Sequence, residues 1–159
     1  MTLPEQVGAL KRAVHRALMR KVALETKRPL LQLSALYVIA RGEIETQTEL
    51  AARLLIDAPA ASRLVDRLEQ DGLLRRAPGS DRRSVRLRVT PASRPHIATL
   101  EAALKWLDAE VKRHLSAQEI NATMRAMKKL QQGLLEGSPG DAQVKNRSAQ
   151  RSAPTSPSA

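Results

Sequence analysis

The fold is decided by the stretch TQTELAARLLIDAPAASRLVDRLEQDGLLRR, residues 46–76. Its first part predicts a short helix over residues 47–55. Thr46 and Glu49 have the spacing of a capping box, in which the threonine hydroxyl accepts from the Glu49 amide and the glutamate reaches back to the Thr46 amide. Two polar side chains therefore mark the start of this helix.

A second helix follows after a tight turn. Asp57 can cap a helix over residues 58–71, and Pro59 falls in its first turn, where a missing amide donor costs nothing. Gly72 then ends the helix. The apolar side chains that we expect to face inward are Leu50, Leu54, Ile56, Leu64, Val65 and Leu68. Two short helices joined in this way predict a helix-turn-helix.

The pattern after Gly72 is that of a hairpin. Residues 73–76 and 85–89 are predicted as strands, since apolar and polar residues alternate in the second stretch and turn-forming residues lie between the two. Residues 73–94 contain one acid, Asp81, and seven arginines, at positions 75, 76, 82, 83, 86, 88 and 94. A helix-turn-helix followed by a basic hairpin is the layout of a winged helix, so we expect a mainly α fold with a small β-hairpin wing.

Helices are also predicted before this core. Apolar residues at steps of three and four predict a first helix over residues 4–27, which Pro29 breaks. A second helix is predicted over residues 31–41, and Gly42 is its C-terminal stop.

Two further helices are predicted after the hairpin. Thr90 is expected to cap the first of them, with Pro91 in its first position, and Ser116 with Glu119 forms a second capping box before the last. The outer helices have apolar faces that the small core cannot wholly cover, which favours pairing between two chains. The residues predicted at this dimer interface are Val7, Leu10, Val14, Leu107, Val111, Ile120, Met124, Met127 and Leu130.

The composition excludes several classes of function. The 159 residues carry 27 lysines and arginines against 16 acids, a formal net charge of +11, which predicts a polyanionic partner. The absence of cysteine excludes disulfides, thiolate metal sites and cysteine nucleophiles. Aromatic residues make up only 1% of the chain, too few for base-stacking modules, so duplex is favoured over single strands.

No catalytic or metal-binding constellation accompanies this charge. His15, His96 and His114 lack the spacing of metal ligands, so we expect no enzyme activity, no metal and no cofactor. Glu43 and Glu45 flank a predicted turn, where we expect them to be solvated. No apolar run has the length of a transmembrane helix and no signal peptide is recognisable, so we expect no membrane partner and a cytoplasmic protein.

The stretch at 46–76, followed by GSDRRSVRLRVTP at 79–91, resembles the winged-helix core of the MarR (multiple antibiotic resistance regulator) family. The likeness is close over residues 31–91, looser over both flanking helical arms, and absent after Gly137. It implies a MarR-like domain over 1–136, with dimerisation helices at 4–28 and 92–136 and the winged helix-turn-helix at 31–91. Residues 137–159, rich in serine, proline and alanine, are predicted to form a disordered tail.

The resemblance also implies how such a protein works. A homodimer would place each recognition helix in a major groove of a palindromic operator and each wing in the adjacent minor groove. Arg83 falls where the family's wing arginine enters the minor groove, with Asp81 placed to orient it. The residues implied at the DNA are Ala58, Pro59, Ala60, Ser62, Arg63, Arg67, Asp81, Arg82, Arg83, Arg86 and Arg88.

Two departures from the family pattern affect the reading of sequence. Leu55 stands where a small turn residue, often glycine, is usual, and Pro59 and Ala60 stand where serine and threonine are usual. Alanine and proline cannot hydrogen-bond base edges, so sequence reading is expected to rest chiefly on Arg63 and Ser62.

Members of the family are commonly repressors and are often released by small anionic or phenolic ligands. His15, Arg28 and Tyr37, together with Trp106, are the candidate contacts for such an effector. Three functions stay open at this point: a sequence-specific transcriptional regulator, an architectural DNA-binding protein of low specificity, and a winged helix used for protein interaction. The density of arginine around the wing favours the first two.

Overall fold

The computed structural model describes residues 1–79 and 85–135. It divides into two compact units, the first from Met1 to Glu110 and the second from Val111 onward. The predicted wing residues Asp81, Arg82 and Arg83 and the tail expected after Gly137 lie outside the described residues. In chain order the elements are α1 (Leu3–Ala23), α2 (Leu30–Ala40), α3 (Gln47–Leu54), α4 (Ala58–Gln70), β1 (Leu74–Pro78), β2 (Val85–Val89), a 3-10 turn (Pro91–Ser93), α5 (Arg94–Lys112) and α6 (Ala117–Leu135).

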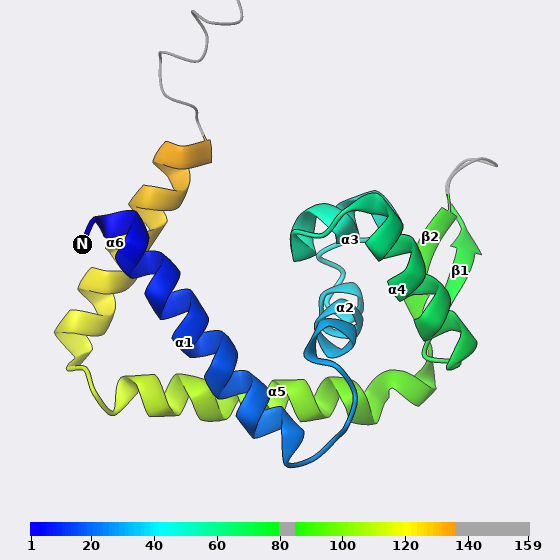
Figure 1. Cartoon of the computed structure of the whole chain (residues 1–159), viewed down its shortest axis with the longest axis horizontal. Coiled ribbons are helices and arrows are strands. Elements are labelled where there is room, and N and C mark those ends of the chain that lie inside the picture. The colour runs from blue at the N-terminus through cyan, green and yellow to red at the C-terminus, as the bar shows by residue number, and fades with distance from the viewer. Residues whose placement is uncertain (80–84, 136–159) are drawn as a thin grey trace, which may run out of the picture. The chain divides into compact units, whose positions relative to one another are not determined.

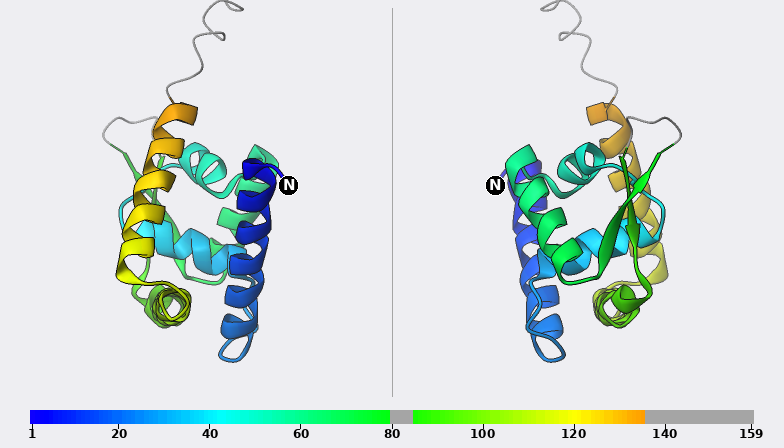
Figure 2. Two further views of the ribbon diagram at one scale, coloured as in Figure 1. Left: turned by 90° about the vertical axis from the view of Figure 1, so that its left-hand side faces the viewer. Right: turned by 90° about the vertical axis from the view of Figure 1, so that its right-hand side faces the viewer.

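The winged helix-turn-helix predicted from the sequence is confirmed. Helices α3 and α4 pack against each other beside α2, and the antiparallel hairpin β1–β2 starts next to the C-terminal end of α4 (Figures 1 and 2). The strand register pairs Leu74 with Val89 and Pro78 with Val85. The chain is thus mainly helical with a two-stranded wing, as expected.

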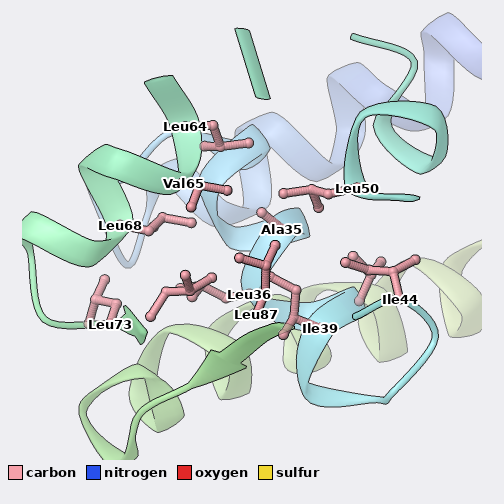
Figure 3. Packing of buried hydrophobic residues seen from close by; sticks show 12 residues of the cluster. Ala35, Leu36, Ile39, Ile44, Leu50, Leu64, Val65, Leu68, Leu73 and Leu87 are labelled. Atoms are coloured by element: carbon pink, nitrogen blue, oxygen red, sulfur yellow. The ribbon is translucent and has the colours of Figure 1, made fainter. Parts of the chain in front are cut away.

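The main core lies between α2, the helix-turn-helix and the hairpin. Leu36, Leu50, Val65 and Leu68 are fully buried in it, and Leu87 brings β2 onto the same cluster (Figure 3). Leu54 and Ile56 are partly buried against it, so all six side chains expected to face inward do so. Burial of this kind, about 25 cal/mol per Å² of apolar surface, is the main source of stability in a small domain.

A second, smaller cluster joins α2 to the long helices. It consists of Val22 from α1, Leu30 and Leu33 from α2, and Leu100 and Ala103 from α5. Tyr37 of α2 packs against both clusters. Helix α2 therefore links the winged core to α1 and α5.

Most helix ends follow from single residues. Gly42 and Gly72 have φ values of 69° and 70°, the left-handed conformation that glycine adopts without strain, and each follows a helix as predicted. Helix α1 differs, because it ends at Ala23 and not near Lys27. There the Thr26 hydroxyl accepts from the Arg28 amide at 3.1 Å, and this local turn replaces the last helical turn.

Thr90 stands at the predicted N-cap position, directly before Pro91, but it precedes a 3-10 turn and its side chain makes no capping hydrogen bond. Its hydroxyl donates to the Gly72 carbonyl at 2.6 Å, so it ties the end of β2 to the end of α4. The chain then passes through the 3-10 turn, in which the Ser93 amide donates to the Thr90 carbonyl, and α5 begins only at Arg94. The Thr90 hydroxyl thus bonds to a carbonyl distant in sequence, and not to an amide of the helix that follows it.

The second unit contains α6. Its predicted capping box is present: the Ser116 amide donates to Glu119 Oε2 at 2.8 Å, and the Glu119 amide donates to Ser116 Oγ at 3.3 Å. No residue of α6 is buried. None of the helices within residues 1–79 and 85–135 is long and apolar enough to cross a membrane.

Candidate nucleic-acid interface

The helix-turn-helix is built by caps at both of its helices. The Thr46 amide donates to Glu49 Oε2 at 2.9 Å and the Glu49 amide to Thr46 Oγ1 at 3.2 Å, which confirms the capping box at the start of α3. The Ala60 amide donates to Asp57 Oδ1 at 2.7 Å, which confirms the cap of α4. Because each helix start is fixed in this way, the two helices meet at a defined turn.

Leu55 forms that turn in a left-handed conformation, with φ 55° and ψ 44°. It is the one residue other than glycine with positive φ among those described, and its side chain is 79% exposed. A β-carbon in this conformation costs about 1 kcal/mol, which explains why glycine suits the position better.

Helix α4 presents one face to the core and the other to solvent. Ala61, Leu64, Val65 and Leu68 are buried. The predicted DNA contacts lie on the remaining surface: Ala58, Pro59, Arg63 and Arg67 are exposed, whereas Ala60 and Ser62 are partly buried.

The two arginines on this face of α4 differ. Arg67 Nε lies 3.3 Å from Asp71 Oδ1, whereas Arg63 has no ion-pair or hydrogen-bond partner among the residues that the structure describes. Arg63 is therefore an exposed arginine of α4 whose guanidinium no other described side chain holds.

Both arginines of β2 are paired with one carboxylate. Arg86 Nη1 forms an ion pair with Glu45 Oε2, and Arg88 Nη1 lies 2.9 Å from Glu45 Oε1. The Leu87 amide also donates to the Glu45 carbonyl, at 2.6 Å, so residue Glu45 holds β2 through both its side chain and its backbone.

A second cluster of this kind joins β1 to α4. Arg76 donates to Asp66 Oδ1 at 2.6 Å and forms a further pair with Glu69, and the hydrogen bond to Asp66 is the first cause of a raised Arg76 pKa. Arg75, the neighbouring arginine of β1, is exposed and has no such partner in the described part of the chain.

Glu43 and Glu45, expected to be solvated, have side chains that are 32% exposed, but each is also paired with arginines. Glu43 accepts from Arg41 Nε at 2.7 Å and from Arg53 at 3.1 Å, and these hydrogen bonds, the one from Arg41 first, hold its pKa below the ordinary value. Each glutamate lies in the turn between α2 and α3. Arg41 is two residues from Glu43, whereas Arg53 comes from α3 and the partners of Glu45 come from β2. No local spacing reveals the partners from α3 and β2.

A cleft of about 460 Å³ lies between the α1–α2 connection, the end of α4 and the start of α5. Its charged lining consists of Lys27, Arg28, Arg67, Asp71 and His96. Arg28 Nη1 donates to Asp71 Oδ2 at 2.8 Å, and this bond is the first cause of a lowered Asp71 pKa. Burial, and then the positive charge of Arg28, lower the pKa of His96.

The other candidate effector residues lie elsewhere. His15 lines a separate hollow on α1, beside Lys11, Arg12 and Arg16. The Tyr37 hydroxyl accepts from Arg41 at 3.1 Å, and its ring lies 5.3 Å from the Arg41 guanidinium. Lys21 Nζ lies 5.8 Å from the centre of the Trp106 ring. Arg28 is thus the candidate that lines the cleft at the end of α4.

The residues predicted at the dimer interface are accessible in the single chain. The strongly exposed ones are Val7 (52%), Leu10 (50%), Val111 (43%), Met124 (63%), Met127 (41%) and Leu130 (41%). Val14, Leu107 and Ile120 are partly buried. The described residues contain no group of three or more side chains that could hold a metal ion.

Comparison with known proteins relates this geometry to a family. The MarR family model matches residues 27–84. The fold is similar to that of the transcriptional regulator PA3341, with 26% sequence identity and a TM-score of 0.75 over 86% of this chain and 100% of that one.

Structures of the multiple antibiotic resistance repressor MarR share the fold at lower identity. One has 23% identity and a TM-score of 0.69 over 82% of this chain and 95% of that one. Another, a MarR mutant from E. coli complexed with operator DNA, has 23% identity and a TM-score of 0.66 over 80% and 92%.

Proposed function

We propose that the chain is a winged-helix transcriptional regulator of the MarR family, and that it acts as a cytoplasmic homodimer that binds a palindromic operator in double-stranded DNA and represses transcription. The observation that carries this proposal is the surface of α4. A capped helix exposes Arg63 without a partner in the described part of the chain, next to a hairpin in which Arg76, Arg86 and Arg88 pair with carboxylates. A MarR protein crystallised with operator DNA supports the same use of the fold.

Arg63 is proposed to read a base edge, because a free guanidinium on an exposed helix face can make two parallel hydrogen bonds to guanine. Arg86 and Arg88, with Arg82 and Arg83 outside the described residues, are proposed to contact the backbone and the minor groove. These contacts position the protein and add affinity without reading sequence. Specificity then depends on few groups of α4.

The experiment selects bound fragments from the source genome and compares their affinity with that for random duplex at fixed salt. A regulator prefers its operator by roughly a thousandfold or more. Arg63→Ala is expected to weaken operator binding more than random binding, whereas Lys105→Ala, which removes one exposed charge from α5, leaves the ratio unchanged. If Arg63→Ala weakened binding to the operator and to random duplex equally, Arg63 would not read a base.

An architectural DNA-binding protein is the second candidate. The small, apolar start of α4, with Ala58, Pro59 and Ala60, favours it, because these side chains offer bases no hydrogen-bonding groups. The same isotherms distinguish the two functions, since an architectural protein binds operator and random duplex with similar affinity.

The dimer is proposed to form through the outer helices. Helix α6 exposes Met124, Met127 and Leu130 along one side, and a lone helix with an uncovered apolar face gains stability by pairing. Met127→Glu is expected to give a monomer by light scattering. Lys128→Glu, which places the same charge on the adjacent polar position, is expected to leave the dimer intact.

The cleft lined by Arg28 is proposed as the effector site. Lys27, Arg28 and Arg67 face it with a single carboxylate, Asp71, so an anion is the ligand class that fits. Benzoate is a suitable probe: it is expected to weaken DNA binding by wild type but not by Lys27→Gln. Lys11→Gln, in the separate hollow beside His15, is expected to respond as wild type does.

A further inference from the structure

One ion pair joins the connection between α1 and α2 to the end of α4. Arg28 Nη1 lies 2.8 Å from Asp71 Oδ2 and 2.7 Å from Gln32 Oε1. The two charged side chains are only 20% and 22% exposed. The pair is therefore shielded from water on most sides, which separates it from ordinary surface ion pairs.

Asp71 is the C-terminal cap of α4. Its amide donates to the Arg67 carbonyl at 3.0 Å, and its Oδ1 lies 3.3 Å from Arg67 Nε. Arg28 contacts the other carboxylate oxygen. Both oxygens of Asp71 are thus engaged, one by α4 itself and one by Arg28, so the position of Arg28 is transmitted to the last turn of α4.

The backbone of Arg28 is fixed in turn by the second core cluster. Its amide donates to Thr26 Oγ1, and Pro29, the next residue, is the N-cap of α2. Leu30 then packs with Val22 of α1 and Leu100 of α5. A rigid segment therefore presents the guanidinium to α4 from the side of the long helices.

The guanidinium is also committed to this position. Its Nε is buried and has no hydrogen-bond partner among the described residues, so its polar contacts with the protein run through Nη1 to Asp71 and Gln32. A desolvated nitrogen without an acceptor is unfavourable, and the two contacts at Nη1 offset this. Loss of Asp71 would leave Arg28 a partly buried charge with Gln32 as its remaining neighbour.

We propose that Arg28 is a positioning residue, which holds the recognition helix α4 in its DNA-binding orientation through Asp71. The proposal rests on the proposed DNA-binding function and assigns Arg28 no contact with DNA. Through this pair the core formed by α1, α2 and α5 acts on the helix that reads DNA, at the end opposite its capped start. Arg28 thus affects operator affinity without lying at the interface.

The test measures operator binding by Arg28→Gln and Asp71→Asn in the full-length protein, beside thermal unfolding and the oligomeric state. Each variant is expected to lose about tenfold in operator affinity. The double variant is expected to lose no more than either single one, because both act through one pair. The salt dependence of binding should stay at the wild-type slope, since no phosphate contact is removed. Arg28→Lys, which keeps the charge, is expected to recover part of the loss.

Arg41→Gln is the matched control. It removes an arginine from another ion pair, with Glu43 at 2.7 Å, away from α4, and is expected to bind operator as wild type does. Wild-type affinity in Arg28→Gln, or additive losses in the double variant, would overturn the proposal. If Arg28→Gln fails to fold, Arg28→Lys and Asp71→Asn decide the question by the same criteria. Failure of wild type to bind any duplex is a different result, which would contradict the proposed function.

Discussion

The paired arginines of the hairpin and the cations of α1 both lie at the surface but differ in their partners. Arg86 and Arg88 share Glu45, and Arg76 is held by Asp66 and Glu69. On α1, by contrast, Lys11, Arg12, Arg16 and Arg20 have no carboxylate partner within the part of the chain that the structure describes.

The two sets of cations are therefore expected to act differently: the paired arginines through the position of their guanidinium groups, and the unpaired cations through the electrostatic field that they produce. A paired arginine contributes little net charge to its surroundings, but its guanidinium is held in place, ready to exchange a carboxylate for a phosphate. Unpaired cations raise the long-range potential, which speeds encounter with DNA and is screened by salt. The number of arginines in the hairpin therefore overstates its charge, and the net charge of +11 alone does not locate the binding surface.

The largest effect is expected from removing the paired arginines. Arg86→Ala with Arg88→Ala should weaken operator binding roughly 100-fold, since each loses a charge-assisted hydrogen bond to phosphate. With two wings in a dimer, the slope of log affinity against log salt should fall by about 3 to 4. Fluorescence anisotropy over a salt series measures both, and an unchanged slope would show that these arginines do not reach the backbone.

A smaller effect is expected from the unpaired cations. Arg12, Arg16 and Arg20, changed together to glutamine, should weaken binding about threefold at about 0.1 M salt and not at all near 1 M, where the screening length is about 3 Å. The control removes three charges from α6 as Arg125→Gln, Lys128→Gln and Lys129→Gln. If the α1 variant lost as much operator affinity as the hairpin variant, the proposed difference between paired and unpaired cations would be wrong.

Removing the shared carboxylate should shift binding in the other direction. Glu45→Gln frees Arg86 and Arg88 from their competitor, so affinity for random duplex is expected to rise about twofold and operator preference to fall. Competition between labelled operator and random duplex measures the ratio. Weaker binding to both duplexes would mean that Glu45 acts chiefly by orienting the two arginines.

The smallest effect concerns the pH dependence of the pair at Asp71. The pKa of Asp71 is lowered from the ordinary value of 3.8, first by the hydrogen bond from Arg28. The ionised carboxylate therefore contributes to stability above pH 3.8, and this contribution is lost as the pH falls through the lowered pKa. Asp71→Asn should unfold at a slightly lower temperature than wild type at pH 7, and the difference should vanish in acid. A difference that persists at the lowest pH would exclude the ionised carboxylate as its source.

Local signals allowed most of the fold to be predicted. Thr46 with Glu49 placed α3, Asp57 with Pro59 placed α4, and Gly72 placed its end, because each signal acts within one helical turn. The identity of the wing followed from alternation in β2.

The partners of the polar side chains could not be predicted in the same way. Arg28 and Asp71 are 43 positions apart, and Glu45 pairs with arginines of β2, a strand that packs against α2. The Thr90 hydroxyl likewise bonds to the Gly72 carbonyl, and not to an amide of the helix that it was expected to cap. Such contacts depend on the tertiary arrangement, which spacing along the chain does not encode.

Helix α6, with none of its 19 residues buried, has a consequence for how gene expression would respond to protein level. Helices in proteins owe most of their stability to packing of an apolar face, so we expect the folding of α6 to be coupled to pairing with a second chain. At copy numbers below the dissociation constant of the dimer, operator occupancy then rises with the square of the concentration. Doubling synthesis would nearly quadruple occupancy in that range, which gives the regulator a threshold without any ligand.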